Sequence, residues 1–333
     1  MKKKLPLVQK VFTTNSFLVE RTLPEEGEIF VKTGENVEPF TKIGGTKVSY
    51  FKVKIPQEFV LKKPIDTFIE KGIEIGEYKK NAIRIVRLYA SFNGFIRKDA
   101  NGYYFEQDKV NFSLLSGLWG EVKEVLANKS VLIQGSATIV YFAASTPHDA
   151  EGELIVFPNP SEILEDPYFN NFTKEIAGKV IYTGYFVKLN NVKKAMNLGV
   201  KGLIAGGCDK TTLEFAKANN FALGAISGFG RIPTPQEIFD LFNSVANRYI
   251  FIRGKKGEIF IPSDRKFSKL VNKEKLSLFS EPKSGMIVQV LERPYFGWMG
   301  TLEDEEKDRF RVRLHQGGKI IYAKPTNILV LDF

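Results

Sequence analysis

The sequence predicts a multi-domain, β-rich protein. Turn signals recur about every 8–12 residues through the N-terminal region, as they do in all-β units. Aromatic residues make up 13% of the 333 residues, and the 28 Phe residues suit strands that bury one face. Towards the middle, short apolar strands alternate with amphipathic helices, which is typical of a parallel sheet. At roughly 100–200 residues per domain, the chain is long enough for two or three domains.

Residues 1–155 are predicted to form an all-β region. In residues 27–44, GEIFVKTGENVEPFTKIG, Ile29 and Val31 alternate with polar residues, and Gly34 permits a tight turn. Residues 68–83 repeat this habit of glycine, short strand, charged turn and strand in a weaker form. The habit resembles the barrel-sandwich hybrid of lipoyl and biotinyl carrier domains, which implies that fold. Lys32 lacks the context of a carrier lysine, so we interpret it as a solvated turn residue.

Residues 156–255 are predicted to form a connector followed by a small α/β domain. Three prolines and an acidic patch in residues 156–175 indicate the connector. The strand and helix patterns after it imply βαβ units and a mostly parallel sheet. Strands are expected at 178–184, 202–207, 221–227 and 249–254, and helices at 191–199, 209–220 and 235–248.

Two glycine-containing turns of this α/β domain are candidate sites for a small anion or nucleotide. Free N–H groups at a helix start attract anions, and open α/β sheets bind ligands beyond the carboxyl ends of their strands. The candidate ligand-binding residues are Gly206, Gly207, Lys210, Gly228, Gly230 and Arg231. The glycine pattern also resembles the swivelling domain of phosphoenolpyruvate-utilising enzymes. That family needs a phospho-accepting histidine where this chain has Thr211 and Thr212, so phosphotransfer is not implied.

Residues 256–280 are predicted to be a basic linker. Residues 251–280 hold eight basic and three acidic side chains, which accounts for half of the net charge of +10. Such a stretch either is solvated or contacts phosphates. The candidate nucleic-acid contacts are Arg253, Lys255, Lys256, Arg265, Lys266 and Lys269.

Residues 281–333 are predicted to form a small β-barrel that folds on its own. Gly285, Val288, Val290, Gly297, Gly300 and Leu302 are followed by strands at Arg311–Leu314 and after Pro325. This pattern resembles the KOW module, an SH3-like barrel of NusG-like elongation factors and ribosomal proteins. The resemblance implies the fold, and a nucleoprotein partner. Tyr295, Phe296 and Trp298 lie together in a turn and are candidates for stacking on bases or gripping a peptide.

Catalytic patterns are scarce in the sequence. The two histidines, His148 and His315, lie far apart and lack metal-ligand spacing. Cys208 is the single cysteine, so no disulfide forms within the chain, and we expect a buried thiol. The N-terminus lacks the apolar core of a signal peptide, and we expect a cytoplasmic protein with no membrane segment. No cofactor and no metal site are predicted.

These observations favour a binding role over catalysis. The first hypothesis is an accessory factor or adaptor that binds RNA, a ribonucleoprotein or a protein of the transcription or translation machinery, such as the ribosome or RNA polymerase. It depends on the KOW-like segment and the basic stretch. The alternative is a protein or enzyme that binds a small anion or nucleotide at the glycine turns of the α/β domain. The sequence leaves the oligomeric state open.

Overall fold

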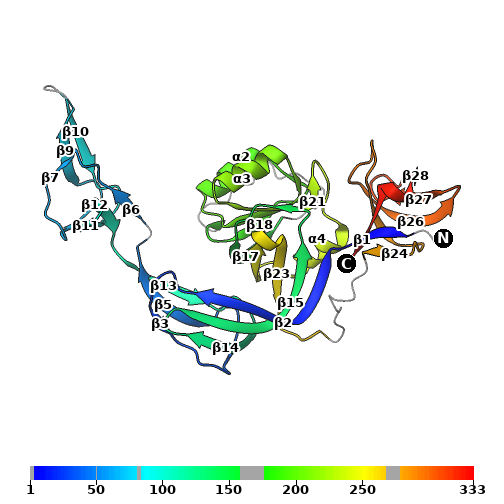
Figure 1. Ribbon diagram of the computed structural model, residues 1–333, viewed down its shortest axis with the longest axis horizontal. Helices are drawn as coiled ribbons and strands as arrows, with labels where there is room; N and C mark the ends of the chain where they lie inside the picture. The colour runs from blue at the N-terminus through cyan, green and yellow to red at the C-terminus, as the bar shows by residue number, and fades with distance from the viewer. Residues whose placement is uncertain (1–3, 50, 81–83, 158–175, 268–277) are drawn as a thin grey trace.

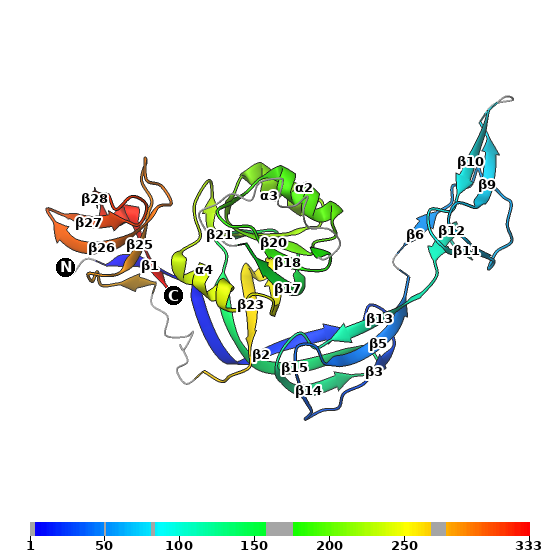
Figure 2. The same ribbon diagram turned by 180° about the vertical axis from the view of Figure 1, so that it is seen from behind.

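The computed structural model describes residues 4–49, 51–80, 84–157, 176–267 and 278–333 (Figure 1). The molecule is β-rich with several sheets, as the sequence predicts, and it is elongated (Figures 1 and 2). Among the described residues, the buried apolar side chains fall into five separate clusters. Each cluster belongs to a region of the fold described below.

A pair of long antiparallel strands, β2 and β15, forms the spine of the first region, which we call the proximal region. Strand β15 pairs with β2 from Ser130 to Val140, and β14 adds to its other edge. Val131, Ile133 and Ile139 of β15 are buried in the proximal core. The strands are β2 (Val11–Thr22), β3 (Glu28–Ile29), β4 (Asn36–Val37), β5 (Lys42–Val48), β13 (Val110–Leu115), β14 (Gly120–Leu126) and β15 (Ser130–Tyr141).

A second β unit, the distal module, is inserted between β5 and β13 and forms one end of the molecule (Figure 1). Its core is its own, built on Ile69, Ile75, Ile96 and Phe105. Residues 1–155 therefore contain two β units, each with its own core, a number that the sequence left open. The strands are β6 (Lys52–Lys54), β7 (Val60–Leu61), β8 (Phe68–Ile69), β9 (Glu74–Lys79), β10 (Ile85–Tyr89), β11 (Gly94–Asp99) and β12 (Gly102–Gln107).

The central α/β region has a parallel core of strands β17, β18, β20 and β21. Helices α2 and α3 pack on one face of these strands, and helix α4 packs on the other. The elements are β16 (Ala144–Ser145), β17 (Ala150–Val156), β18 (Val180–Tyr182), β19 (Phe186–Val187), α2 (Leu189–Asn197), β20 (Gly202–Cys208), α3 (Lys210–Ala218), β21 (Ala222–Phe229), α4 (Gln236–Ser244), β22 (Tyr249–Arg253), the 3-10 turn η2 (Gly254–Lys256) and β23 (Glu258–Ser263).

One 12-stranded sheet joins the α/β region to the proximal region, because β23 pairs with both β22 and β15. The expected boundary at residue 155 falls inside β17, which pairs with β18 and β22. The expected linker over 256–280 begins with β23, whose Ile259, Phe260 and Ile261 are buried. The lysines and arginines on either side give this stretch its basic composition. The short buried strand between them was therefore not recognised from composition. The greater part of the predicted connector, residues 158–175, lies outside the described residues.

The C-terminal sheet has seven strands, and one of them comes from the start of the chain. Strand β1 runs parallel to β29, and Leu5 is fully buried in the core of this sheet. A segment of residues 281–333 therefore lacks two strands of its own sheet, β1 and β24. The elements are β1 (Leu5–Gln9), β24 (Phe279–Ser280), β25 (Ile287–Val290), β26 (Met299–Glu306), β27 (Arg309–Leu314), β28 (Ile320–Ala323), the 3-10 turn η4 (Pro325–Asn327) and β29 (Ile328–Asp332).

Candidate functional site

Gly206 and Gly207 lie inside strand β20 and not in a turn after it. Their N–H groups donate to the carbonyls of Gly184 at 2.8 Å and Tyr185 at 3.0 Å. A Cβ atom on Gly207 would collide with the carbonyl oxygen of Gly230. These glycines therefore allow the backbone to approach closely, and neither N–H is free to donate to an anion, which differs from the expectation.

The second glycine turn is also held by the protein itself. The Gly230 N–H donates to the Cys208 carbonyl at 3.0 Å, and the Tyr185 hydroxyl donates to the Arg231 carbonyl. Gly228 and Gly230 have φ of +121° and +102°, a conformation that favours glycine. The exposed Arg231 guanidinium lies 5.8 Å from the centre of the Phe186 ring. The turn closes over the end of β20 and leaves Arg231 as its one charged group.

Lys210, the third predicted residue of this group, lines a pocket that holds four lysines, which we call the lysine pocket. Its volume is about 600 Å³. Helix α3 supplies Lys210 and Lys217, and the turn η2 supplies Lys255 and Lys256. The other lining residues are Ser145, Thr146, Pro147, Leu213, Glu214, Phe229, Gly254 and Gly257. The fold thus brings together a predicted anion contact and two predicted nucleic-acid contacts.

Local geometry explains how two separate segments present their lysines to one pocket. Lys210 and Lys217 are seven residues apart on α3, which places them two turns apart on the same helix face. The Gly254 N–H donates to the Asp149 carboxylate at 2.9 Å. A Cβ atom on Gly254 would collide with the carbonyl oxygens of Thr146 and His148. The loop before β17 therefore holds η2 closely and positions Lys255 and Lys256.

The lysine pocket is electropositive. Its lining has four ammonium groups against the single carboxylate of Glu214. That carboxylate lies 3.7 Å from the Lys210 ammonium, and both side chains are exposed. Phe229, at the end of β21, is 48% exposed and adds an apolar surface beside the charges. The pocket can therefore attract a multiply charged anion and contact a flat apolar group next to it.

The remaining predicted basic contacts lie elsewhere. Arg253 is half-buried, with its guanidinium 3.7 Å from the Glu258 carboxylate and 4.1 Å from the centre of the Phe17 ring. Burial lowers the pKa of Arg253, and the side chain belongs to the interior. Arg265 and Lys266 line a different pocket, described below. Lys269 lies outside the described residues. The predicted basic set is therefore distributed over several places.

The aromatic turn of the C-terminal sheet packs inwards. Tyr295 and Trp298 contact each other edge to face at 5.4 Å between ring centres and pack against the core of this sheet. Gly297 between them lies against Ile232 of the α/β region, leaving no room for a side chain. Phe296 is 54% exposed and is the member of the trio that is open to solvent. Tyr295 and Trp298 therefore have a packing role here, while Phe296 remains accessible to a partner.

The two histidines and the single cysteine are held by local contacts or burial. A ring nitrogen of His148 lies 2.9 Å from the Lys217 carbonyl, and one of His315 lies 2.9 Å from the Thr301 hydroxyl. Burial raises the pKa of the Cys208 thiol to about 12, which keeps it protonated. Among the described residues, no three His, Cys, Asp or Glu side chains gather in a way that could hold a metal ion.

Sequence reasoning missed Lys217 and Phe229. The spacing of seven between Lys210 and Lys217 on a predicted helix was a usable signal, because it indicates a shared face. The approach of η2 to α3 left no usable signal in the sequence, because it depends on strand pairing across the large sheet.

Comparisons with known proteins give little more. No protein-family model matches the chain, and no curated protein matches it. A solved structure described as the solution NMR structure of a UPF0107 protein matches 38% of this chain and 99% of its own. The identity is 14% and the TM-score is 0.28, which is too low to carry an argument. Within the described parts of the chain, no helix combines the length and apolar character needed to cross a bilayer.

Proposed function

We propose that the protein is a non-catalytic binding protein whose lysine pocket takes a nucleoside diphosphate or triphosphate. The observation that carries this proposal is the convergence of Lys210, Lys217, Lys255 and Lys256 on one pocket. With Glu214, the lining has an excess of three positive charges, which complements the charge of a diphosphate or triphosphate. A volume of about 600 Å³ lies within the usual range for small-ligand pockets.

Contact with Phe229 should make the pocket bind a nucleotide more tightly than an inorganic anion. Its ring is exposed beside the lysines, where a base can stack on it. Stacking of a base on an aromatic side chain contributes about 1–3 kcal/mol. The ammonium groups of lysine act as point charges without a fixed geometry, so they accept several phosphate arrangements.

The second candidate function is binding of RNA as part of a nucleoprotein machine, which the KOW-like segment suggests. One observation favours it: the side chain of Lys210 is 80% exposed, so the phosphate of a longer chain can reach it. RNA and nucleotides share the phosphate chemistry of this pocket, and the experiment must separate them.

The test measures binding of ADP, ATP and inorganic pyrophosphate by calorimetry, and of a short single-stranded RNA by fluorescence anisotropy. We expect the nucleotides to bind, and the variants Lys210→Gln/Lys217→Gln and Lys255→Gln/Lys256→Gln each to lose roughly tenfold or more in affinity. Lys201→Gln is the matched control, since Lys201 is exposed in the same region but outside the pocket. Affinity should fall with salt, less steeply in the variants.

A further variant separates the roles of charge and stacking. Phe229→Ala should weaken ADP and ATP by about tenfold and leave pyrophosphate unchanged, because only the nucleotides have a base to stack. If RNA binds and the nucleotides do not, the second candidate replaces the first. Absence of binding by all of these probes at low salt would show that the pocket has neither function.

A further inference from the structure

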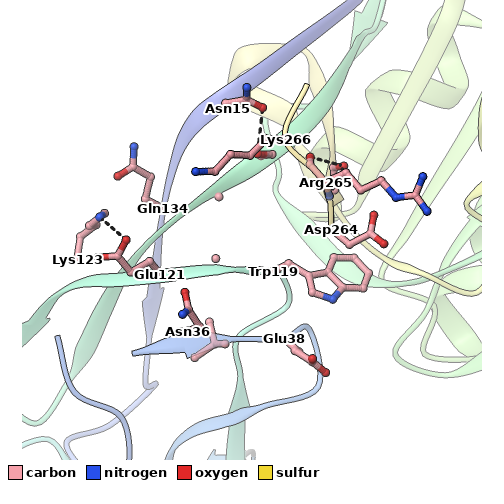
Figure 3. A pocket seen from close by; sticks show the side chains of 15 residues that line it. Asn15, Asn36, Glu38, Trp119, Glu121, Lys123, Gln134, Asp264, Arg265 and Lys266 are labelled. Carbon is pink, nitrogen blue, oxygen red and sulfur yellow. Dashed lines mark hydrogen bonds and ion pairs between the residues drawn. The ribbon is translucent and has the colours of Figure 1, made fainter. Parts of the chain in front are cut away.

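A second pocket, which shares no lining residue with the lysine pocket, has a different chemistry. It lies where the segment that follows β23 crosses strands β14 and β15, and Figure 3 shows its lining side chains. Its volume is about 490 Å³. Gly120 and Gly135 lie opposite each other in the β14–β15 ladder and both line the pocket. A Cβ atom would collide with the Gln134 carbonyl oxygen at Gly120 and with the Trp119 carbonyl oxygen at Gly135, so these glycines let the two strands approach closely beside the pocket.

The lining is polar but its charges cancel. Three carboxylates, those of Glu38, Glu121 and Asp264, stand against the cationic groups of Lys123, Arg265 and Lys266. Asn36 and Gln134 add amides, and Trp119 adds an aromatic ring (Figure 3). Unlike the lysine pocket, this pocket, which we call the Trp119 pocket, has no field that would attract a polyphosphate.

The wall of the Trp119 pocket is held in place by hydrogen bonds. The Asn15 side chain accepts from the Phe267 N–H and donates to the Phe267 carbonyl, both at 2.7 Å. Its oxygen also accepts from the Ser136 hydroxyl at 3.1 Å. These bonds fasten the segment that holds Asp264, Arg265 and Lys266 onto β2 and β15. The pocket is therefore pre-organised, which lowers the entropic cost of binding.

Arg248 lies over one face of the Trp119 indole and holds it in position. The Arg248 guanidinium lies 5.5 Å from the centre of the indole, and the same arginine lies 4.0 Å from the Asp264 carboxylate. The indole is partly exposed, so it is accessible to a ligand in the pocket.

Several polar side chains that line the pocket still have hydrogen-bonding groups free for a ligand. The side chains of Asn36 and Glu38 make no hydrogen bond to another described residue. The Gln134 amide donates to the Ser16 hydroxyl at 2.8 Å, which leaves its carbonyl oxygen as an acceptor. Together these side chains offer acceptors from a carboxylate and donors from an amide within one pocket.

We propose that the Trp119 pocket binds a neutral carbohydrate. Sugar hydroxyls both donate and accept hydrogen bonds, and the mixture of amides and carboxylates around the pocket serves both roles. The less polar face of a sugar ring suits the indole of Trp119. The zero net charge of the lining suits a ligand without charge. This site is separate from the lysine pocket and goes beyond the nucleotide function proposed for it.

The test titrates the full-length protein with maltotetraose, cellotetraose and chitotetraose, using calorimetry and tryptophan fluorescence. The Trp298→Phe variant is used for the fluorescence, since it leaves Trp119 as the single tryptophan. We expect at least one of the three sugars to bind and to change the Trp119 emission. Asn36→Ala and Glu38→Gln should each weaken binding by about three- to tenfold, the loss expected for one hydrogen bond.

The controls separate this site from general damage and from the lysine pocket. Asn111→Ala is the matched control for Asn36→Ala, because Asn111 is also exposed on a strand of the proximal region but lies outside the pocket. Lys255→Gln/Lys256→Gln should leave sugar binding unchanged. The proposal is wrong if none of the three sugars binds at millimolar concentration, or if binding is unchanged in both Asn36→Ala and Glu38→Gln. Displacement of the sugar by pyrophosphate in the Lys255→Gln/Lys256→Gln variant would also overturn it.

Discussion

Gly34 and Gly72 hold equivalent positions in two turns of the same construction, one in the proximal region and one in the distal module. Their φ angles are +87° and +88°. The Gly34 N–H donates to the Val122 carbonyl and the Gly72 N–H to the Ala90 carbonyl, both at 2.8 Å. In return, the Val122 N–H donates to the carbonyl of Glu35 and the Ala90 N–H to the carbonyl of Ile73, the residues after the two glycines, both at 2.8 Å. The distal module thus repeats a turn of the region into which it is inserted.

Alanine at either glycine should destabilise its own unit by about 1–2 kcal/mol, because an L-residue is strained at this φ. Steric collision does not contribute, since no atom lies within 4 Å of a Cβ built at either position. Amide hydrogen exchange measures this separately for each unit. Gly72→Ala should raise exchange in residues 51–107 alone, and Gly34→Ala should raise it in the proximal strands. Asparagine at each position should cost less than alanine, and equal costs would contradict a purely conformational cause.

The sequence predicted those parts of the fold that depend on local pattern. Helices α2, α3 and α4 and strands β18, β20, β21 and β22 form where the periodicity of 3.6 or the short apolar runs predicted them. The weaker echo of residues 27–44 in residues 68–83 was also visible, because both contain the glycine of the repeated turn.

Long-range pairing could not be predicted from local pattern. Nothing in residues 5–9 indicates that β1 pairs with β29, which follows it by more than 300 residues. Gly206 and Gly207 suggested an anion-binding turn, yet their function in packing depends on the return of the chain at Gly230. The sequence analysis selected Lys210, Lys255 and Lys256 as members of two different sites, and it did not predict that they line one pocket.

Leu5→Ala should destabilise the C-terminal sheet by about 2–5 kcal/mol, the usual cost of a large-to-small change in a core. Leu5 is fully buried there, although it lies at the other end of the chain. Urea denaturation followed by Trp298 fluorescence in a Trp119→Phe background reports on this sheet. Leu278→Ala is the control, since Leu278 is 75% exposed, and it should cost little. A loss as small as the control's would mean that β1 does not contribute to the stability of this sheet.

Arg21 and Glu151 form an ion pair between β2 and β17 that connects the proximal and α/β regions, in which the Arg21 side chain is buried and the Glu151 side chain is 41% exposed. Arg21 also donates to the Leu115 carbonyl at 3.0 and 3.1 Å, and Tyr249 donates to Glu151 at 3.0 Å. Glu151→Gln should cost about 1–3 kcal/mol, because it removes the counter-charge of the buried guanidinium while solvent at the half-exposed carboxylate screens part of the interaction. Adding Arg21→Met should recover part of that loss. A double variant as unstable as the sum of the two single variants would contradict coupling between the pair.

Lys10→Met should change how stability depends on pH. Lys10 is buried between the C-terminal sheet and the α/β region, where its ammonium donates to the Ile226 carbonyl at 2.9 Å. Burial lowers the pKa of Lys10 from 10.5 to about 8. Between these values the unfolded chain holds the proton and the folded protein does not, so the free energy of unfolding rises with pH through this window. Below pH 8 both states are protonated, and the cost of the buried charge remains in full.

The stability of the wild type relative to Lys10→Met should therefore rise by on the order of 3 kcal/mol between pH 8 and pH 10.5. Other lysines and tyrosines titrate in both proteins and cancel in the difference. Urea denaturation of the two proteins at pH 7, 9 and 10.5 measures it. At pH 7 the variant gains from removing the buried charge but leaves the Ile226 carbonyl without its donor, so the pH dependence is the decisive quantity. Parallel stability profiles across this range would show that the Lys10 ammonium is hydrated in the folded protein.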